Sequence, residues 1–215
     1  MQSLTAAVKP RNALLVRAAN EYANVIREFA ALESNPVLEL LQNVVQFELD
    51  HKYPADPLSF AHDHWRAYYH SHVSPISVNG EHGHFHFFCR VAETGVKSED
   101  WTHVAGLSID MQGQPLMWFT VNQWVTGDAW VPAEDLFNRL ELSLLPKNEG
   151  LLLRWTMTML CLYRDELREL LIFRDRKILS MQQKNTEQNI LQSKSIYELS
   201  SSSINVLDKL SAVIH

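Results

Sequence analysis

The stretch His82-Gly83-His84-Phe85-His86-Phe87-Phe88 decides the fold, because histidines occupy every second position of its first half. Alternation is the side-chain period of a β-strand, so the pattern predicts a strand over residues 82–91. The three histidines would then share one face, while Phe85 and Phe87 would point to the other face, under covering helices. The stretch therefore predicts both a sheet and a row of imidazoles along one side of it.

Similar alternation occurs before and after this strand. Residues 65–72 predict a second strand, although a helix over residues 60–69 is the alternative there. Residues 102–110 and 116–125 predict a hairpin, joined by a turn that contains Gly113. We therefore expect a central, mostly antiparallel sheet spanning residues 65–125.

The sheet region is flanked by apolar residues at helical spacing. This spacing predicts N-terminal helices within residues 10–52, the second with Asn35 as its N-cap and Pro36 in its first turn. It also predicts helices within residues 133–176. The fold class is therefore α+β, with a central sheet flanked by N- and C-terminal helices.

The predicted domain covers residues 1–180, and the polar residues 181–215 are expected to form a C-terminal extension. The chain has 215 residues and is 46% hydrophobic, which suits an ordinary globular core. Its net charge of −6 argues against nucleic acid or an anionic membrane surface as the main partner.

Two further features bear on localisation. The N-terminus has no apolar run typical of a signal peptide, and the strongly apolar residues 151–163 are too few to cross a bilayer. Cys89 and Cys161 lie in apolar surroundings without Cys-x-x-Cys spacing, as buried thiols do in a reducing compartment. We therefore expect a soluble, cytoplasmic protein without a membrane partner.

Nine of the ten histidines lie between His51 and His103. Imidazoles at alternate strand positions start about 7 Å apart and can converge on one ion at about 2.0–2.1 Å each. The ion would be Zn²⁺, Fe²⁺ or Mn²⁺, and its affinity should weaken as the pH falls through about 6.5. The candidate ligands are His70, His72, His82, His84 and His86, with Glu81 or Glu93 as a carboxylate ligand.

A small anionic ligand is the alternative occupant of this predicted cavity. Its candidate binding residues are Arg66, Tyr68, Arg90 and Asn122, with Thr120 beside them. The face on which His103 lies depends on the strand register, which the sequence leaves open.

Residues 82–88 also resemble the histidine-triad signature, in which histidine and apolar residues alternate. The resemblance implies that His84 attacks an α-phosphate, as in a nucleotide hydrolase or transferase, with His82 and His86 in support. Gly83 departs from the signature, which has an apolar residue at this position.

A third hypothesis is a non-enzymatic interaction module with structural histidines. A homodimer through the amphipathic helices is compatible with each hypothesis, and whether the protein is an enzyme stays open.

A longer similarity covers about residues 53–130. The sequences EHGHFH at residues 81–86 and FTVNQWVTG at residues 119–127 resemble a bacterial family of uncharacterised proteins. This resemblance implies one domain of bacterial type, and it brings no known activity with it.

Overall fold

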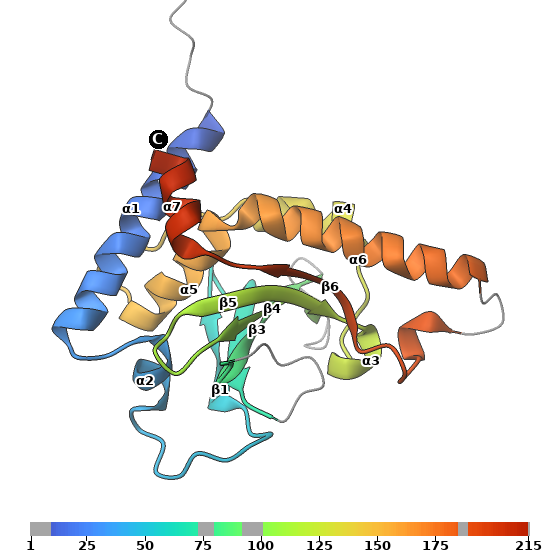
Figure 1. The fold of residues 1–215 in the computed structure, drawn as a ribbon, viewed down its shortest axis with the longest axis horizontal. Coiled ribbons are helices and arrows are strands. Elements are labelled where there is room, and N and C mark those ends of the chain that lie inside the picture. Colours follow the sequence, from blue (N-terminus) through green and yellow to red (C-terminus); the bar gives the residue numbers. More distant parts are fainter. Residues whose placement is uncertain (1–9, 73–79, 92–100, 185–188, 215) are drawn as a thin grey trace, which may run out of the picture.

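The computed structural model describes residues 10–72, 80–91, 101–184 and 189–214. Most of the turn expected within residues 74–81, and also Glu93, lie outside these ranges. The sheet has six antiparallel strands whose spatial order is their order in the chain, and the long helices lie on one side of it (Figure 1). The predicted α+β fold class, with helices before and after a mostly antiparallel sheet, is confirmed.

Four strands lie close to where the alternating pattern predicts them, and two come from segments without such a pattern. The strands are β1 (Tyr53–Phe60), β2 (Trp65–His70), β3 (Gly83–Arg90), β4 (Trp101–Ile109), β5 (Pro115–Val121) and β6 (Glu198–Ser203). β1 contains Pro54 and Pro57, which suggest a loop, but it lies at an edge of the sheet, where prolines are tolerated. The expected sheet limits of 65–125 are therefore too narrow at both ends.

β6 comes from the segment that was expected to be a polar extension. It pairs with β5 from Met117–Ser203 to Val121–Glu198 and forms the other edge of the sheet. The Ser200 hydroxyl is bonded to the Thr120 hydroxyl at 2.6 Å and donates to a main-chain carbonyl of the covering helix. Backbone pairing and hydroxyl bonds thus place this serine-rich strand without apolar alternation.

The expected helices are present with different ends, and two further helices, over residues 123–126 and 206–214, lie outside the expected ranges. They are α1 (Pro10–Ala31), α2 (Pro36–Leu41), α3 (Gln123–Thr126), α4 (Ala133–Leu136), the 3₁₀ turn η1 (Phe137–Leu140), α5 (Leu151–Leu162), α6 (Arg164–Lys184), the 3₁₀ turn η2 (Ile190–Gln192) and α7 (Val206–Ile214). Asn35 caps α2 as predicted, since its side chain accepts hydrogen bonds from two backbone N–H groups of the first turn. α2 ends at Leu41 instead of near Lys52, because Val45 and Leu49 are exposed and gain nothing from a helical face.

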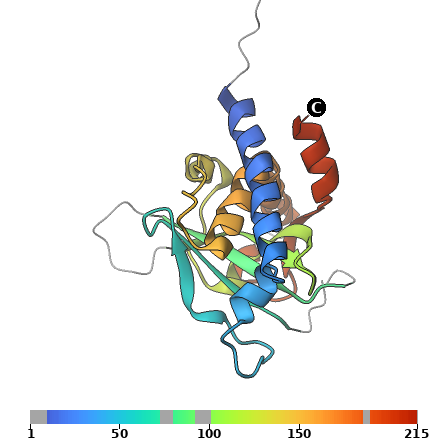
Figure 2. The ribbon, with the colours of Figure 1, turned by 90° about the vertical axis from the view of Figure 1, so that its left-hand side faces the viewer.

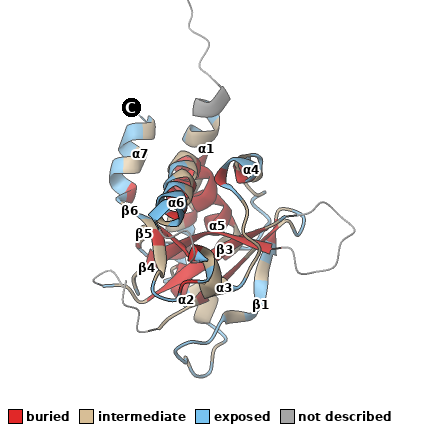
Figure 3. Cartoon of the chain, turned by 90° about the vertical axis from the view of Figure 1, so that its right-hand side faces the viewer, coloured by how far each residue is buried: buried red, intermediate tan, exposed pale blue. Residues whose placement is uncertain are grey.

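The main hydrophobic core lies between one face of the sheet and α1, α5 and α6. Phe85 packs against Trp155 of α5 with ring centroids 5.3 Å apart, and Phe87 packs against Trp118 at 5.6 Å. α5 is buried along almost its whole length (Figure 3), and α7 lies beside α1 (Figure 2). Among the described residues, the helices are too short or too polar to cross a bilayer.

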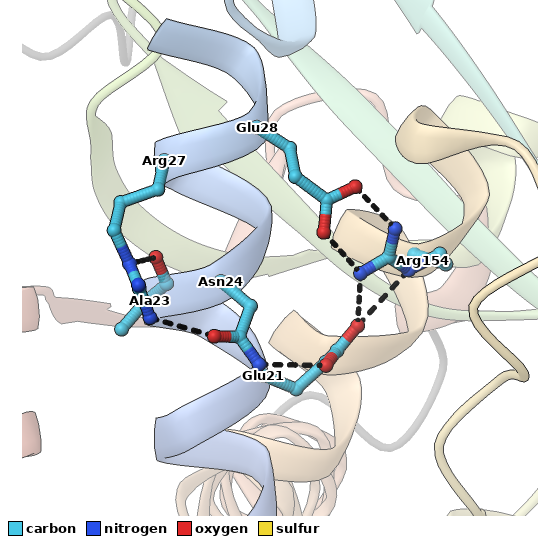
Figure 4. Close-up of polar contacts among 6 residues, drawn as sticks. All are labelled: Glu21, Ala23, Asn24, Arg27, Glu28 and Arg154. Carbon is cyan, nitrogen blue, oxygen red and sulfur yellow. Dashed lines mark hydrogen bonds and ion pairs between the residues drawn. The ribbon is translucent and has the colours of Figure 1, made fainter. Parts of the chain in front are cut away.

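An ion cluster joins α1 to α5. Arg154 on α5 is 3% exposed, and its guanidinium donates to Glu21 at 2.6 and 3.0 Å and to Glu28 at 2.6 and 2.9 Å (Figure 4). The two glutamates are seven residues apart, so they lie on the same face of α1. The hydrogen bond from Arg154 lowers the pKa of Glu28. One buried cation therefore holds two carboxylates that would otherwise repel each other.

We expect Arg154→Met to lower the free energy of unfolding by about 2–3 kcal/mol at neutral pH, because it leaves two carboxylates without their cation. The folded-state pKa of Glu28 is below its ordinary value of 4.5, so this stabilisation is present above that pH and is lost as the pH falls further. The difference between variant and parent in urea unfolding should therefore shrink in acid. Arg27→Met, at an exposed position on α1, is the matched control, and an equal loss in both variants would contradict a specific role for Arg154.

Candidate metal centre

Strand register brings the histidines to one face of the sheet. His70 of β2 is directly opposite His84 of β3, and Tyr68 is opposite His86. A shift in register between Phe87 and Phe88 places His103 of β4 opposite Phe88. His103 therefore lies on the same face as His84 and His86, which answers the question that the sequence left open. We call His70, His72, His84, His86 and His103 the imidazole cluster.

Three ring nitrogens meet at His70. Its Nε2 lies 2.8 Å from Nε2 of His84 and 3.1 Å from Nε2 of His86. The His72 ring is 4.9 Å from the rings of both His70 and His84. One ligand atom each from His70, His72 and His84 can be chosen so that all three lie within 4.8 Å of one another. Two strands and the residues after β2 thus supply a compact set of nitrogen donors.

Glu81 and His103 contact the outer nitrogens of two of these rings. Glu81 Oε1 lies 2.5 Å from Nδ1 of His84, and His103 Nε2 lies 2.8 Å from Nδ1 of His86. An ionised carboxylate only accepts hydrogen bonds, so His84 Nδ1 carries the proton that is donated to Glu81. That tautomer leaves a lone pair on Nε2 of His84, on the side that faces His70.

Phe119 of β5 packs against the cluster through space left by a glycine. Its ring is edge-on to His84 at 5.3 Å and to His86 at 5.8 Å. Gly106 is opposite both His86 and Phe119 in the sheet, and a Cβ at Gly106 would overlap the Phe119 ring. The absence of a side chain at residue 106 therefore allows the phenyl ring to support the two imidazoles.

Burial favours the uncharged form of four of these rings, those of His70, His84, His86 and His103. Burial, with smaller effects from nearby His84, His72 and Lys52, lowers the pKa of His70 to about 3. Burial also lowers the pKa of His103 to about 3, with a smaller effect from Arg174. The pKa values of His84 and His86 are lowered by burial too, although Glu81 partly opposes the shift at His84. At neutral pH these rings are therefore neutral, and a neutral imidazole has one nitrogen lone pair to offer.

His82 belongs to the motif, but the structure does not bring it into the cluster. It precedes β3, its Nδ1 lies 2.5 Å from the Tyr69 hydroxyl, and its ring stacks on Phe47 at 5.4 Å. Tyr69 belongs to the core on the helix side of the sheet. The alternation that predicts a shared face for the three histidines applies only within the strand, and β3 begins at Gly83.

The predicted anion-binding residues do not lie together at one site. Tyr68 contacts His70 and His86, with ring centroids 5.6 and 5.4 Å away. Arg66 and Arg90 lie farther along β2 and β3, where their guanidinium carbons are 4.5 and 4.9 Å from the Trp101 ring centroid. Arg66 is also paired with an aspartate, Asp128, at 3.2 Å. The guanidinium groups of Arg66 and Arg90 thus lie over an aromatic ring. Binding of an anionic ligand beside them stays a prediction.

Asn122 and Thr120 have other contacts. Asn122 caps α3, and its amide donates to the carbonyl oxygens of Ile190 and Ile196 at 2.8 and 3.3 Å. Thr120 is bonded to Ser200, on the helix side of the sheet. The sequence predicts Glu81 only as one of two alternative carboxylate ligands, and it does not predict a role for Gly106 or Phe119. No sequence signal identifies Gly106 and Phe119 as neighbours, because their contact depends on the alignment of β4 with β5.

His84 is the nucleophile that the histidine-triad resemblance implies. It is 5% exposed, its Nδ1 is bonded to Glu81, and its Nε2 faces His70. Both ring nitrogens of His84 therefore face other side chains, Glu81 on one side and His70 on the other. This geometry suits a ring that holds an ion better than one that attacks an external phosphate.

The metal-free protein should lose stability as the pH falls below 6.5. Unfolding returns His70, His86 and His103 to the ordinary pKa of 6.5, so the unfolded chain takes up protons that the folded chain excludes. The contribution of these neutral rings to the free energy of unfolding is then fully present above pH 6.5. It decreases as the pH falls toward the folded-state pKa, which is about 3 for His70 and His103. Each such ring contributes a slope of about 1.4 kcal/mol per pH unit.

Urea unfolding in the presence of a chelator, between about pH 7 and about pH 5, measures this slope. His103→Gln should reduce it, whereas His62→Gln, at an exposed position, should leave it unchanged. A slope that is the same in parent and His103→Gln would contradict the exclusion of protons from the cluster.

Comparison with known proteins gives a family and no closer relative. No curated protein matches the chain, and no solved structure matches it. Residues 16–204 match the family described as a domain of unknown function, DUF6969. This span includes the whole imidazole cluster and all six strands, and it ends one residue after β6. Because it covers most of the sequence, the chain belongs to the DUF6969 family.

Proposed function

We propose that this protein binds a divalent transition-metal ion in the imidazole cluster, with His70, His72 and His84 as ligands and His86 as a fourth ring at the ion. The observation that carries the proposal is the convergence of three histidine ligand atoms within 4.8 Å. Metal ions are bound by deprotonated ligands, and burial lowers the pKa of His70, His84 and His86, which favours their neutral form.

The number of protons on the facing ring nitrogens favours a bound ion over a network made of hydrogen bonds alone. His70 Nε2 faces Nε2 of both His84 and His86, and His84 Nε2 carries a lone pair because its proton is on the side of Glu81. If His70 Nε2 is protonated, it can donate fully to only one of its two neighbours. If it is unprotonated, two lone pairs face each other across 2.8 Å. A cation between the rings accepts a lone pair from each of them and removes this conflict.

The distances support the same conclusion. Two ligands at about 2.0–2.1 Å from one ion lie about 2.9 Å apart at a right angle and about 3.4 Å apart at the tetrahedral angle. The nitrogen pairs at 2.8 and 3.1 Å are close to this range. Small rotations of His70, His84 and His86 would therefore be enough to fit an ion between these three rings.

The donor set indicates which ions fit best. Imidazole nitrogen suits zinc and iron, whereas manganese prefers oxygen ligands, and intrinsic affinity rises from Mn²⁺ through Fe²⁺ to Zn²⁺. The contact from Glu81 to His84 supports this site further, because a carboxylate that accepts the outer N–H of a ligating histidine fixes its orientation. We therefore place Zn²⁺ first, Fe²⁺ second and Mn²⁺ third.

Metal analysis of the purified protein tests the proposal, together with titration of the chelated protein by Zn²⁺, Fe²⁺ and Mn²⁺. The parent protein should bind one equivalent, and His70→Gln and His84→Gln should each weaken binding at least about tenfold. His82→Gln is the matched control, because this histidine belongs to the same motif but lies outside the cluster. Equal binding by parent, His70→Gln and His84→Gln would place any ion elsewhere.

Gly106→Ala should weaken metal binding while leaving every ligand in place. The added methyl group would displace the Phe119 ring toward His84 and His86, and overpacking of this kind costs about 1–3 kcal/mol. Zinc titration and urea unfolding measure the two effects, and a second change, Phe119→Leu, should restore part of the affinity. Gly150→Ala is the control, since a Cβ there meets no atom within 4 Å. Unchanged zinc affinity in Gly106→Ala would show that the packing of Phe119 does not position the ligands.

A further inference from the structure

Lys52 lies on the same face of the sheet as the imidazole cluster. Tyr53, the first residue of β1, pairs with Tyr69 of β2, and both tyrosines pack into the core under the helices. Successive side chains point to opposite faces, so Lys52, which directly precedes β1, lies on the side of Tyr68. Its ammonium is 4.4 Å from the centroid of the Tyr68 ring, and that ring is 5.6 Å from the ring of His70. A cation therefore lies beside the proposed metal ligands.

The charge of this ammonium affects the cluster. The pKa of His70 is lowered first by burial, then by the neighbouring imidazoles and by Lys52. Lys52 is therefore close enough to oppose a second positive charge at His70. A metal ion at His70 would meet the same repulsion, because neutral imidazole ligands leave the ion its full charge.

The carboxylates near the site do not balance these positive charges. Glu81 and Asp50 both raise the pKa of Tyr197, so both carboxylates lie near that side chain. The ion pair of Arg66 adds no net charge. A divalent ion and Lys52 would bring three positive charges against the two carboxylates. One positive charge is then left over, and a bound anion would balance it.

The cluster is most accessible on the side of this lysine. His84 and His86 are 5% and 2% exposed, whereas His70 and His72 are half-buried and Lys52 is exposed. A small molecule that comes from solvent therefore meets Lys52 and the two half-buried rings first. The three converging ligand atoms belong to His70, His72 and His84, and three protein ligands leave a coordination position for such a molecule. Zinc also expands to five ligands, so His86 and a small molecule can bind together.

We propose that a small oxyanion, a carboxylate or a phosphate, binds at the metal ion with Lys52 as its second contact, so that ion and anion strengthen each other's binding. This inference rests on the proposed metal site and adds the class of molecule that the site takes. An oxyanion has at least two oxygens, of which one can bind the ion and another can accept a hydrogen bond from the ammonium. A neutral molecule of the same shape lacks the required charge.

Zinc titrations of the chelated full chain, in competition with a chromophoric chelator, test the proposal at equal ionic strength. Each titration contains acetate, methylphosphonate or the neutral acetamide. Relative to acetamide, at least one of the two oxyanions should raise the zinc affinity about fivefold or more, as typical coupling between two sites does. The comparison of acetate with methylphosphonate shows whether the site prefers a carboxylate or a phosphate.

Lys52→Gln separates recognition of the anion from a structural role. In acetamide its zinc affinity should rise about twofold, because a like charge near the ion is gone. The enhancement by the oxyanion should fall by at least about half, and Lys52→Arg should keep most of it. A lysine with only a structural role would give the opposite sign in acetamide. Lys147→Gln, at an exposed position near Glu28 of α1, is the matched control and should behave as the parent does.

The possible failures of the two proposals are distinguishable. Zinc affinity that is equal in acetamide and in both oxyanions would overturn this inference alone. An enhancement of the same size in parent and Lys52→Gln would overturn the role of Lys52 in binding the anion. Failure of the parent protein to bind zinc in every buffer would overturn the proposed function, and this inference with it.

Discussion

The alignment of β3 between β2 and β4 is the constraint on which the imidazole cluster depends. Phe85 and Phe87 are completely buried against the helices, and burying a side chain of this size contributes about 1.5–3 kcal/mol. Because alternate residues point to opposite faces, a shift of one residue would remove both phenylalanines from the core and place the histidines among the helices. The aromatic residues therefore determine the face on which His84 and His86 lie.

Placing several imidazoles together away from water has a cost, and the surrounding residues limit it. Burial removes the protonated forms, as the lowered pKa values of His70 and His103 show, and Glu81 and His103 provide partners for two outer nitrogens. The inner nitrogens around His70 remain in conflict when only one proton is shared among them. This shortage of protons among the inner nitrogens is the physical basis on which we propose a metal ion at this cluster.

The sequence predicts those parts of the fold that follow from local periodicity. Alternation locates β2 to β5, and Asn35 with Pro36 locates the start of α2. It misses β1 and β6, since prolines and serines give no apolar alternation and backbone pairing at the edges places these strands. For the candidate site, residues on one strand are predictable, but contacts across strands are not. The face of His103, the position of Gly106 beside Phe119 and the different direction of His82 all depend on alignment or on where a strand begins.

β5 contributes two adjacent residues to different features, the imidazole cluster and a cavity on the helix side of the sheet. Phe119 packs edge-on against His84 and His86, while Trp118 points to the opposite face and forms part of the cavity wall. Successive side chains of a strand always diverge in this way, so the cluster and the cavity share a backbone and no side chain. Pairing of β5 with β4 and with β6 fixes both residues at once. One short strand between two neighbours therefore contributes to the imidazole cluster on one face of the sheet and to a cavity on the other.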